Sequence, residues 1–343
     1  MIAGGDEQLV DPDLRAALSV LPDLGILTDE TLSEIRQLLA VTAPLEPPLG
    51  LTVESVSLPG NDGAPDVTGL LHRPATPGPH AAILNLHGGG FVAGTAERED
   101  AAMRTLALEL DAVILSINYR LAPETRFPGA LEDAFAALSW LHTEAAALEI
   151  DHTRIAVRGV SAGGGLAAGL ALFTRDHGGP AIAFLSLVYP MLDDRTGPHP
   201  AAGQYVWPIA ANRFGWSSYL AKLDPVPIYA APGRAESLIG LPPTFIGTGA
   251  IDLFIDEDIR FAQALIRAGV ATELHVYPGA YHGFTLIAAS GLAQRFERDS
   301  LEALRRALRG ANEALTASRG GPIVGTGQLG RAAGGNATRN DEL

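Results

Sequence analysis

Short apolar runs alternate with longer stretches of helical periodicity from about residue 51 to residue 290. The strand-like runs occupy residues 81–87, 112–119, 154–160, 182–189, 243–249 and 272–278. The helical stretches between them include 97–110, 128–147, 162–176 and 256–268. Strands separated by helices indicate βαβ crossovers. The pattern therefore predicts an α/β fold, with a mostly parallel central sheet and helices on both of its faces.

Two segments interrupt this alternation. Helical patterns precede it within residues 11–41, and residues 194–240 form a long insertion rich in proline and aromatic residues. We expect the insertion to be a small helical layer, because long insertions between sheet elements are usually functional lids or disordered loops, and its aromatic content argues against disorder. Two runs at 51–60 and 66–74 predict an antiparallel hairpin at the sheet edge. The predicted division is 1–48 for N-terminal helices, 49–193 and 241–317 for the core, 194–240 for the insertion and 318–343 for a flexible tail.

Composition narrows the possible functions. Of the 343 residues, 47% are hydrophobic and 18% are charged, which favours a folded chain with a sizeable core. A net charge of −15 argues against nucleic acid as a partner. The chain has no cysteine, which excludes disulfides and thiolate catalysis. Neither a secretory signal nor an apolar run long enough to span a membrane is evident, so a cytoplasmic protein is expected.

The segment "GVSAG", residues 159–163, places Ser161 between two glycines. A β-type run precedes it and a helical pattern follows it, which is the strand–turn–helix context of a nucleophile elbow. In such an elbow the flanking glycines, Gly159 and Gly163, allow the strand and helix backbones to approach each other. The motif alone is a weak signal in a chain with 39 glycines.

A serine that attacks a carbonyl group needs backbone amides to stabilise the oxyanion. The segment "HGGGF" follows an earlier strand, and its residues Gly88, Gly89 and Gly90 can expose their amides. Ala162, directly after the serine, supplies a further donor in the arrangement typical of lipases and esterases. The alternative reading, a phosphate loop, would require a lysine or a G-x-G-x-x-G segment that opens a helix.

The base that activates Ser161 has to be a histidine. Of the nine histidines, His282 is the best candidate because it follows the last predicted strand in a loop. Asp252 comes first after the preceding strand and is the candidate that orients the imidazole. The alternatives to Asp252 are the other carboxylates nearby, namely Asp256, Glu257 and Asp258, with Asp193 and Asp194 as a fallback. The order serine, aspartate, histidine is the one found in α/β-hydrolases.

The chain as a whole resembles the hormone-sensitive-lipase-like esterases (bacterial family IV) of the α/β-hydrolase superfamily, from about residue 50 to residue 290. The segments that carry the resemblance are "HGGGF", "YRLAPETRFPGALED", "GVSAGG", "GLPPTFIGTGAIDLFIDE" and "AGVATELHVYPGAYHGF". The resemblance implies an α/β-hydrolase fold and a helical cap built from the N-terminal helices and the insertion. It implies structural roles for Arg120 and Glu124, and often a homodimer. Many members carry an acid or a threonine before the nucleophile, whereas this chain has Val160.

The expected activity is hydrolysis of short- to medium-chain carboxylic esters by Ser161, His282 and Asp252, with donors at Gly89, Gly90 and Ala162 and without cofactor or metal. Gly88 completes the oxyanion motif. The aromatic residues proposed for the substrate pocket are Phe91, Trp207, Phe214, Trp216 and Tyr219. Those of the insertion would equally serve to pack the cap on the core. An amidase or formamidase would use the same groups. Non-catalytic relatives such as the plant gibberellin receptors lack the catalytic histidine, which is present here.

Overall fold

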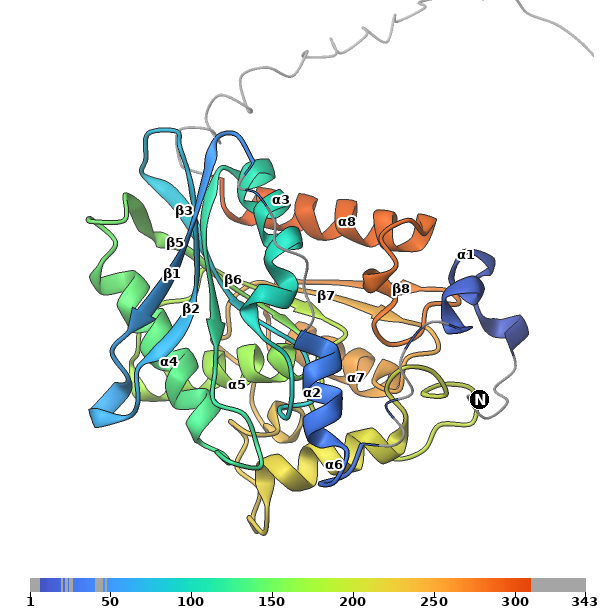
Figure 1. Ribbon diagram of the computed structural model, residues 1–343. Coiled ribbons are helices and arrows are strands. Elements are labelled where there is room, and N and C mark those ends of the chain that lie inside the picture. The colour runs from blue at the N-terminus through green and yellow to red at the C-terminus, as the bar shows by residue number, and fades with distance from the viewer. Residues whose placement is uncertain are drawn as a thin grey trace, which may run out of the picture. The chain divides into compact units, whose positions relative to one another are not determined.

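An eight-stranded sheet forms the centre of the computed structural model, in the order β1-β2-β4-β3-β5-β6-β7-β8 (Figure 1). The structure describes residues 7–19, 21, 24, 27–40, 46 and 48–309. The strands are β1 Leu51–Leu58, β2 Val67–Pro74, β3 His80–Leu86, β4 Ala112–Asn118, β5 Ile150–Val160, β6 Phe184–Val188, β7 Thr244–Gly249 and β8 Thr272–Tyr277. The β1–β2 and β2–β4 pairs are antiparallel, and the other neighbours are parallel. The predicted parallel sheet and its antiparallel edge hairpin are confirmed.

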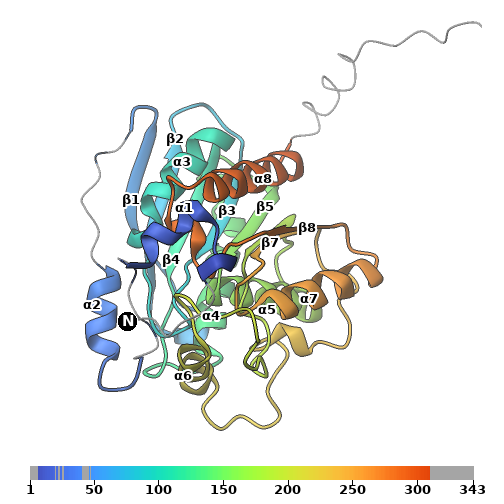
Figure 2. The same cartoon turned by 90° about the vertical axis from the view of Figure 1, so that its right-hand side faces the viewer.

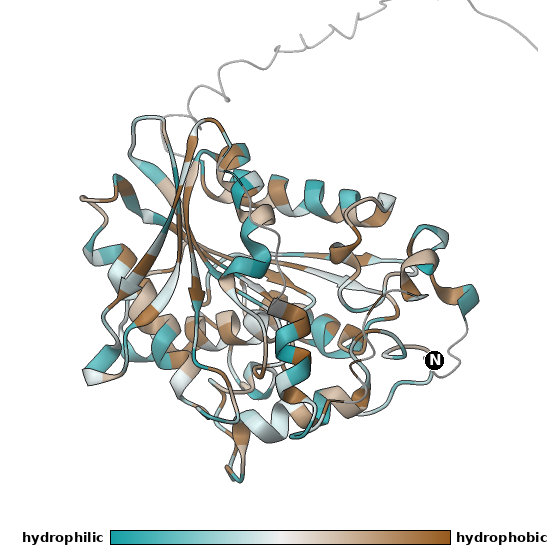
Figure 3. Cartoon of the chain, viewed as in Figure 1, coloured by the Kyte–Doolittle hydropathy of each residue, from teal (hydrophilic) through white to brown (hydrophobic). Residues whose placement is uncertain are grey.

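Three inner strands are buried along their whole length and mostly apolar, because helices cover both of their faces. Every residue of β3, β6 and β7 is buried, and parallel strands of this kind lack the alternation of half-exposed strands. Figure 3 shows the same strands coloured as hydrophobic through the centre of the molecule. Burial on both faces explains why short, mostly apolar runs in the sequence locate these strands.

Helices cover the two faces of the sheet (Figures 1 and 2). One face packs against α3 and α8 through a cluster that includes Met103 and Phe296, and the other against α4, α5 and α7 through a cluster that includes Leu131 and Leu166. The main helices are α3 Asp100–Leu110, α4 Gly129–Thr143, α5 Ala162–His177, α7 Ile255–Arg267 and α8 Gly291–Ala307. Four of them match the predicted stretches, whereas α8 has no counterpart in the prediction.

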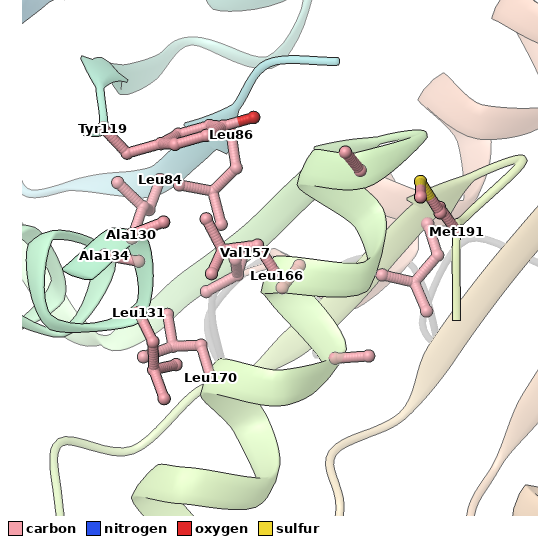
Figure 4. Close-up of a cluster of buried hydrophobic side chains, with 14 of the residues drawn as sticks. Leu84, Leu86, Tyr119, Ala130, Leu131, Ala134, Val157, Leu166, Leu170 and Met191 are labelled. Atoms are coloured by element: carbon pink, nitrogen blue, oxygen red, sulfur yellow. The ribbon is translucent and has the colours of Figure 1, made fainter. Parts of the chain in front are cut away.

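The tightly filled layer between the sheet and helices α4 and α5 fixes the strand ends that carry the site. Side chains of Leu84 and Val157 from the sheet meet Leu131 of α4 and Leu170 of α5 (Figure 4), and all four are buried. Close-packed protein interiors have low compressibility and transmit strain. The carboxyl ends of β3 and β5 are therefore held at a fixed separation.

The N-terminal part and the insertion add short helices outside this core. The N-terminal elements are η1 Glu7–Leu9, α1 Pro12–Arg15, η2 Ala16–Ser19 and α2 Leu32–Ala40. Between β6 and β7, the insertion contains α6 Ile209–Leu220 and η6 Pro232–Arg234. The remaining short helices are η4 Asn61–Gly63, η5 Ala96–Glu99 and η7 Phe284–Leu286. The tail expected to be flexible, 318–343, lies outside the described residues. Among the helices that the structure describes, none is long and apolar enough to cross a membrane.

Candidate active site

Ser161 stands alone between β5, which ends at Val160, and α5, which begins at Ala162. Its backbone angles are φ 55° and ψ −117°, a region that residues other than glycine rarely adopt. The turn is tight enough that a Cβ at Gly159 would overlap the carbonyl oxygen of Gly163, and a Cβ at Gly163 would overlap that of Leu86. Strain of this kind persists where the surrounding structure fixes it. The geometry is that of the elbow expected from "GVSAG".

A continuous chain of hydrogen bonds links Ser161, His282 and Asp252. The Ser161 Oγ lies 2.9 Å from His282 Nε2, and His282 Nδ1 lies 2.8 Å from Asp252 Oδ2. Side chains of all three are buried, with relative exposures of 4%, 5% and 0% for the residues in that order. Nucleophile, base and orienting acid at such distances are the arrangement required for an activated serine.

The ends of parallel strands bring these groups together. Asp252 follows β7 and His282 follows β8, so both loops emerge at the carboxyl edge of the sheet beside the end of β5. The amide of Phe254 donates to Asp252 Oδ1 at 2.9 Å, which fixes the carboxylate with its other oxygen toward His282. Phe254 also meets the imidazole edge-on, with ring centroids 5.1 Å apart.

The carboxylates considered as alternatives to Asp252 are engaged elsewhere. Asp193 pairs with Arg195 at 2.6 Å, and Asp194 pairs with Arg234 at 2.5 Å. Asp256 has a side chain 61% exposed and lies 4.0 Å from His199. Glu257 and Asp258 are buried within α7. None of these five is hydrogen-bonded to His282 in the described part of the chain.

The glycine segment after β3 contains two free amides and one that is occupied. Gly89 and Gly90 have φ values of 124° and 63°, which glycine adopts readily. Within the described residues their amides donate to no other group of the chain, and the Ala162 amide is at the first position of α5, where helices leave amides unpaired. By contrast, the Gly88 amide donates to Glu99 Oε1 at 3.3 Å. In this structure the Gly88 amide is therefore engaged by Glu99, and we keep only Gly89, Gly90 and Ala162 as proposed donors to an oxyanion.

His87, the first residue of the same segment, supports the loop. Its Nδ1 lies 2.8 Å from the Gly88 carbonyl oxygen, and its ring stacks on Tyr119 with centroids 4.2 Å apart. The Tyr119 hydroxyl in turn donates to the His87 carbonyl oxygen at 2.8 Å. Burial lowers the pKa of His87 below its ordinary value, which keeps the imidazole neutral. This contact pattern fits the expected role of orienting the loop.

A cavity of about 130 Å³ opens beside Ser161 and His282. Its apolar wall includes Leu24, Leu39, Val160, Val206, Trp207 and Leu286. Val160, the residue that departs from the family pattern, thus contributes an apolar surface next to the serine. Trp207 lies against Gly90, because a Cβ at Gly90 would overlap its ring.

Four of the five aromatic residues expected in the pocket do not line this cavity. Phe91 stacks on Tyr219 with ring centroids 4.0 Å apart, and Trp216 packs against Phe91 at 5.3 Å. Phe214 packs against the core from a partly buried position. These contacts match the alternative expectation that the aromatic residues pack the insertion on the core, and a place for these four in the substrate pocket stays a prediction. Trp207 alone of the five lines the cavity.

Arg120 and Glu124 hold different partners in the loop that follows β4. The Arg120 amide and Nε donate to Asp133 of α4 at 2.7 and 2.9 Å. Glu124 binds Arg36 of α2 through two hydrogen bonds of 2.7 and 2.8 Å, which lowers the pKa of Glu124 to about 2. Arg36 also donates to the Val92 carbonyl oxygen at 2.7 Å. Helix α2 is thereby bound to the segment that follows the glycines of residues 88–90 and to the loop after β4.

Glu257 is a buried carboxyl group that links α7 to the loop after β6. Its Oε1 accepts hydrogen bonds from the amides of Leu192 and Asp193 at 2.6 and 3.3 Å, and the Thr196 hydroxyl also contacts the carboxyl. Burial raises the pKa of Glu257 from 4.5 to about 8. The folded protein therefore keeps a proton here that the unfolded chain releases at lower pH.

We expect Glu257→Gln to make the free energy of unfolding less dependent on pH. Because folding raises this pKa, the wild type loses stability as pH rises from about 4.5 to about 8. Glutamine does not ionise and keeps an acceptor for Leu192, so it should stabilise the variant relative to the wild type at pH 8 by on the order of 1–4 kcal/mol more than at pH 5. Urea unfolding at several pH values measures this. Asp256→Asn, at an exposed neighbour, is the control, and a variant-to-wild-type difference that is constant with pH would contradict the prediction.

Comparison with known proteins adds independent information. The model of a protein family described as having the alpha/beta hydrolase fold matches residues 83–286. Esterase LipI of Mycobacterium tuberculosis (strain ATCC 25618 / H37Rv) is 36% identical over 290 residues, covering 81% of this chain and 89% of the relative. Carboxylesterase NlhH of the same organism is 34% identical over 312 residues, covering 87% and 96%. The solved structure of a bacterial heroin esterase is similar with a TM-score of 0.81 and 40% identity, covering 88% and 99%.

Proposed function

Because the chain belongs to the alpha/beta-hydrolase fold, among the hormone-sensitive-lipase-like esterases of bacterial family IV, we propose that it uses Ser161, His282 and Asp252 to cleave short- to medium-chain esters. The general activity, carboxylic ester hydrolysis, is that of its relatives over most of the chain. The observation that carries the proposal is the hydrogen-bonded chain from Ser161 Oγ through His282 to Asp252 at 2.9 and 2.8 Å, beside a cavity.

In the first half of the reaction, Ser161 Oγ attacks the ester carbonyl carbon while His282 Nε2 takes the hydroxyl proton. The carbonyl electrons move onto oxygen, and the amides of Gly89, Gly90 and Ala162 donate hydrogen bonds to the resulting oxyanion. Asp252 stabilises the imidazolium through Nδ1. When the tetrahedral intermediate collapses, His282 returns the proton to the leaving alcohol oxygen, and the acyl group remains on Ser161.

In the second half, water takes the place of the alcohol. His282 removes a proton from water, the hydroxyl oxygen adds to the acyl carbon, and the same three amides bind the second oxyanion. Collapse breaks the bond to Ser161 Oγ, which regains its proton from His282. The products are the carboxylic acid and the free enzyme.

Covalent trapping tests the nucleophile directly. We expect a fluorophosphonate to add one phosphonyl group to the protein at Ser161, detected by intact mass and peptide mapping. Pre-incubation should abolish ester hydrolysis in proportion to the labelled fraction. A protein that hydrolyses esters at an unchanged rate after complete labelling, or that is labelled at another serine, would contradict the assignment.

The size of the cavity is the argument for small acyl groups as substrates. Its volume of about 130 Å³ is near the ~150 Å³ of an apolar protein cavity that accommodates benzene. Trp207 closes one side against Gly90, and Leu24, Leu39 and Leu286 make much of the remaining wall apolar. The polar side chains that line the cavity besides Ser161 and His282 include His87, Thr95, Arg98 and Glu99. A short alkyl chain would fill such a space, and a long one would have to leave it.

We expect kcat/KM for p-nitrophenyl esters to be greatest between acetate and octanoate and to fall by about tenfold or more for palmitate, because the surplus methylenes find no apolar wall. Initial rates across the series measure this, and a maximum at palmitate would contradict it.

The matched anilides test the amidase alternative: if an anilide were hydrolysed faster than the ester of the same acyl group, an amidase would replace the esterase as the proposed function. The cytoplasmic location and the homodimer expected from the sequence stay predictions.

A further inference from the structure

A cluster of polar side chains lies beside the glycine segment of residues 88–90, here called the oxyanion loop. The cluster is on the face of the sheet that α3 and α8 cover. Asn85 of β3 and Arg158 of β5 are register partners, and they share this face with the buried apolar residues Ile83 and Ala156. Arg158 Nη1 donates to Asn85 Oδ1 at 2.7 Å. Glu99 of η5 completes the cluster: its Oε2 accepts from Asn85 Nδ2 at 2.9 Å and from Arg158 Nη1 at 3.3 Å.

These groups are largely removed from water. Asn85 is 0% exposed, and the side chains of Arg158 and Glu99 are 10% and 17% exposed. Burying a charge is costly unless it is paired and hydrogen-bonded. The pairing leaves Glu99 little freedom to turn, because two donors from adjacent strands hold Oε2 in one place. The second carboxylate oxygen is therefore aimed in a fixed direction.

That direction is the oxyanion loop, because Glu99 Oε1 accepts the hydrogen bond of the Gly88 amide at 3.3 Å. A run of three glycines, residues 88–90, has more conformational freedom than any other sequence and contributes no side chain to restrain it. The backbone conformation of these three residues must therefore be fixed by contacts with neighbouring residues. Glu99 holds the first of the three amides, and this orients the peptide groups that follow.

We infer that Glu99 is a positioning residue for ester hydrolysis: held by Arg158 and Asn85, its carboxylate fixes the Gly88 amide so that the Gly89 and Gly90 amides point at the developing oxyanion. The inference rests on the proposed function, because it takes Ser161 as the nucleophile and these amides as the donors. Glu99 itself exchanges no proton with the substrate. Its contribution is greatest in the transition state, when the carbonyl oxygen becomes charged.

Glu99→Gln is the sharpest test, because glutamine has the same shape and only one acceptor oxygen. The donors from Arg158 and Asn85 favour that oxygen, which turns the side-chain NH₂ toward the Gly88 N–H and removes the hydrogen bond. We expect kcat to fall by roughly 10-fold to 100-fold, somewhat less than for deletion of an oxyanion donor, with KM changed by less than about threefold. Affinity for a trifluoromethyl ketone, which forms an oxyanion on the serine, should fall in parallel with kcat/KM.

Glu97→Gln is the matched control, since Glu97 lies in the same short helix and its carboxylate contacts Asn118 rather than the loop. It should keep kcat within about twofold of the wild type. Glu99→Ala is a second test of the effect on kcat, because its result does not depend on the orientation of a glutamine side chain. Thermal unfolding shows whether each variant is folded. A folded Glu99→Gln and a folded Glu99→Ala with normal kcat, or a rise in KM alone, would overturn the inference.

The two proposals fail in different ways. If Ser161 is not the nucleophile, the wild type will not be labelled there by a fluorophosphonate. If only the role of Glu99 is wrong, the wild type will be labelled at Ser161 and the Glu99 variants will turn over and bind the trifluoromethyl ketone like the wild type.

Discussion

Replacing Ser161 with alanine is expected to lower kcat for p-nitrophenyl butyrate by about 10⁴-fold to 10⁶-fold, since the residual rate of a triad without its nucleophile comes from binding and oxyanion stabilisation alone. Stability should change little. Among the described residues, the Ser161 hydroxyl makes one hydrogen bond, to His282, and alanine meets the same backbone strain at φ 55° as serine does. Steady-state rates and thermal unfolding of the purified variant measure both effects.

Ser186→Ala is the matched control for this variant. Ser186 is a buried serine on the neighbouring strand β6, and its hydroxyl has no hydrogen-bond partner among the described residues. Its loss should leave kcat within about twofold of the wild type. If Ser161→Ala retained more than about one hundredth of the wild-type kcat, the nucleophile would have to be sought elsewhere.

Asp252→Asn is expected to lower kcat by about 10³-fold to 10⁴-fold, the size of the effect when an orienting carboxylate is lost. The Phe254 amide donates to one oxygen of the native carboxylate at 2.9 Å. In the variant, the amide oxygen would take this bond and the NH₂ group would face His282 Nδ1. The imidazole would then carry its proton on Nε2, where it cannot accept the Ser161 proton. Rates as a function of pH should show the loss at every pH near neutrality.

The same substitution at Asp256 separates this effect from a general loss of charge. Asp256 is four residues further along the chain with a 61% exposed side chain, so Asp256→Asn should keep kcat within about twofold of the wild type. Equal losses in the two variants would mean that Asp252 acts through the overall charge of the segment, and not through the His282 tautomer.

The sequence was sufficient to predict which residues meet at the site, because each candidate follows a strand. Ser161, Asp252 and His282 lie just beyond β5, β7 and β8, and in a parallel sheet these strand ends share one edge. Of these strands, β7 is buried along its whole length because both faces of the sheet are covered there, whereas β5 and β8 combine apolar residues with charged ones such as Arg158 and Glu273. The assignment of catalytic roles stays a prediction until the variants are measured.

Side-chain partners could not be predicted in the same way. Aromatic character did not distinguish Trp207, which lines the cavity, from Phe91 and Tyr219, which stack on each other. Helix α8 lies beyond residue 290, where the predicted alternation ends, although its buried residues Phe296, Ala303 and Leu304 recur at helical spacing. The pairing of Glu99 with Arg158 joins positions 59 residues apart, and no local pattern connects them.

The Ser161–His282 hydrogen bond spans 121 residues of sequence, and this separation has a consequence for the protein during its synthesis. When Ser161 and the glycine segment of residues 88–90 leave the ribosome, His282 has not yet left it, because it lies 121 residues further along the chain. In the proposed mechanism, a nascent chain therefore carries no hydrolytic activity until nearly the whole core has emerged, since non-local contacts of this kind form only when both partners are present.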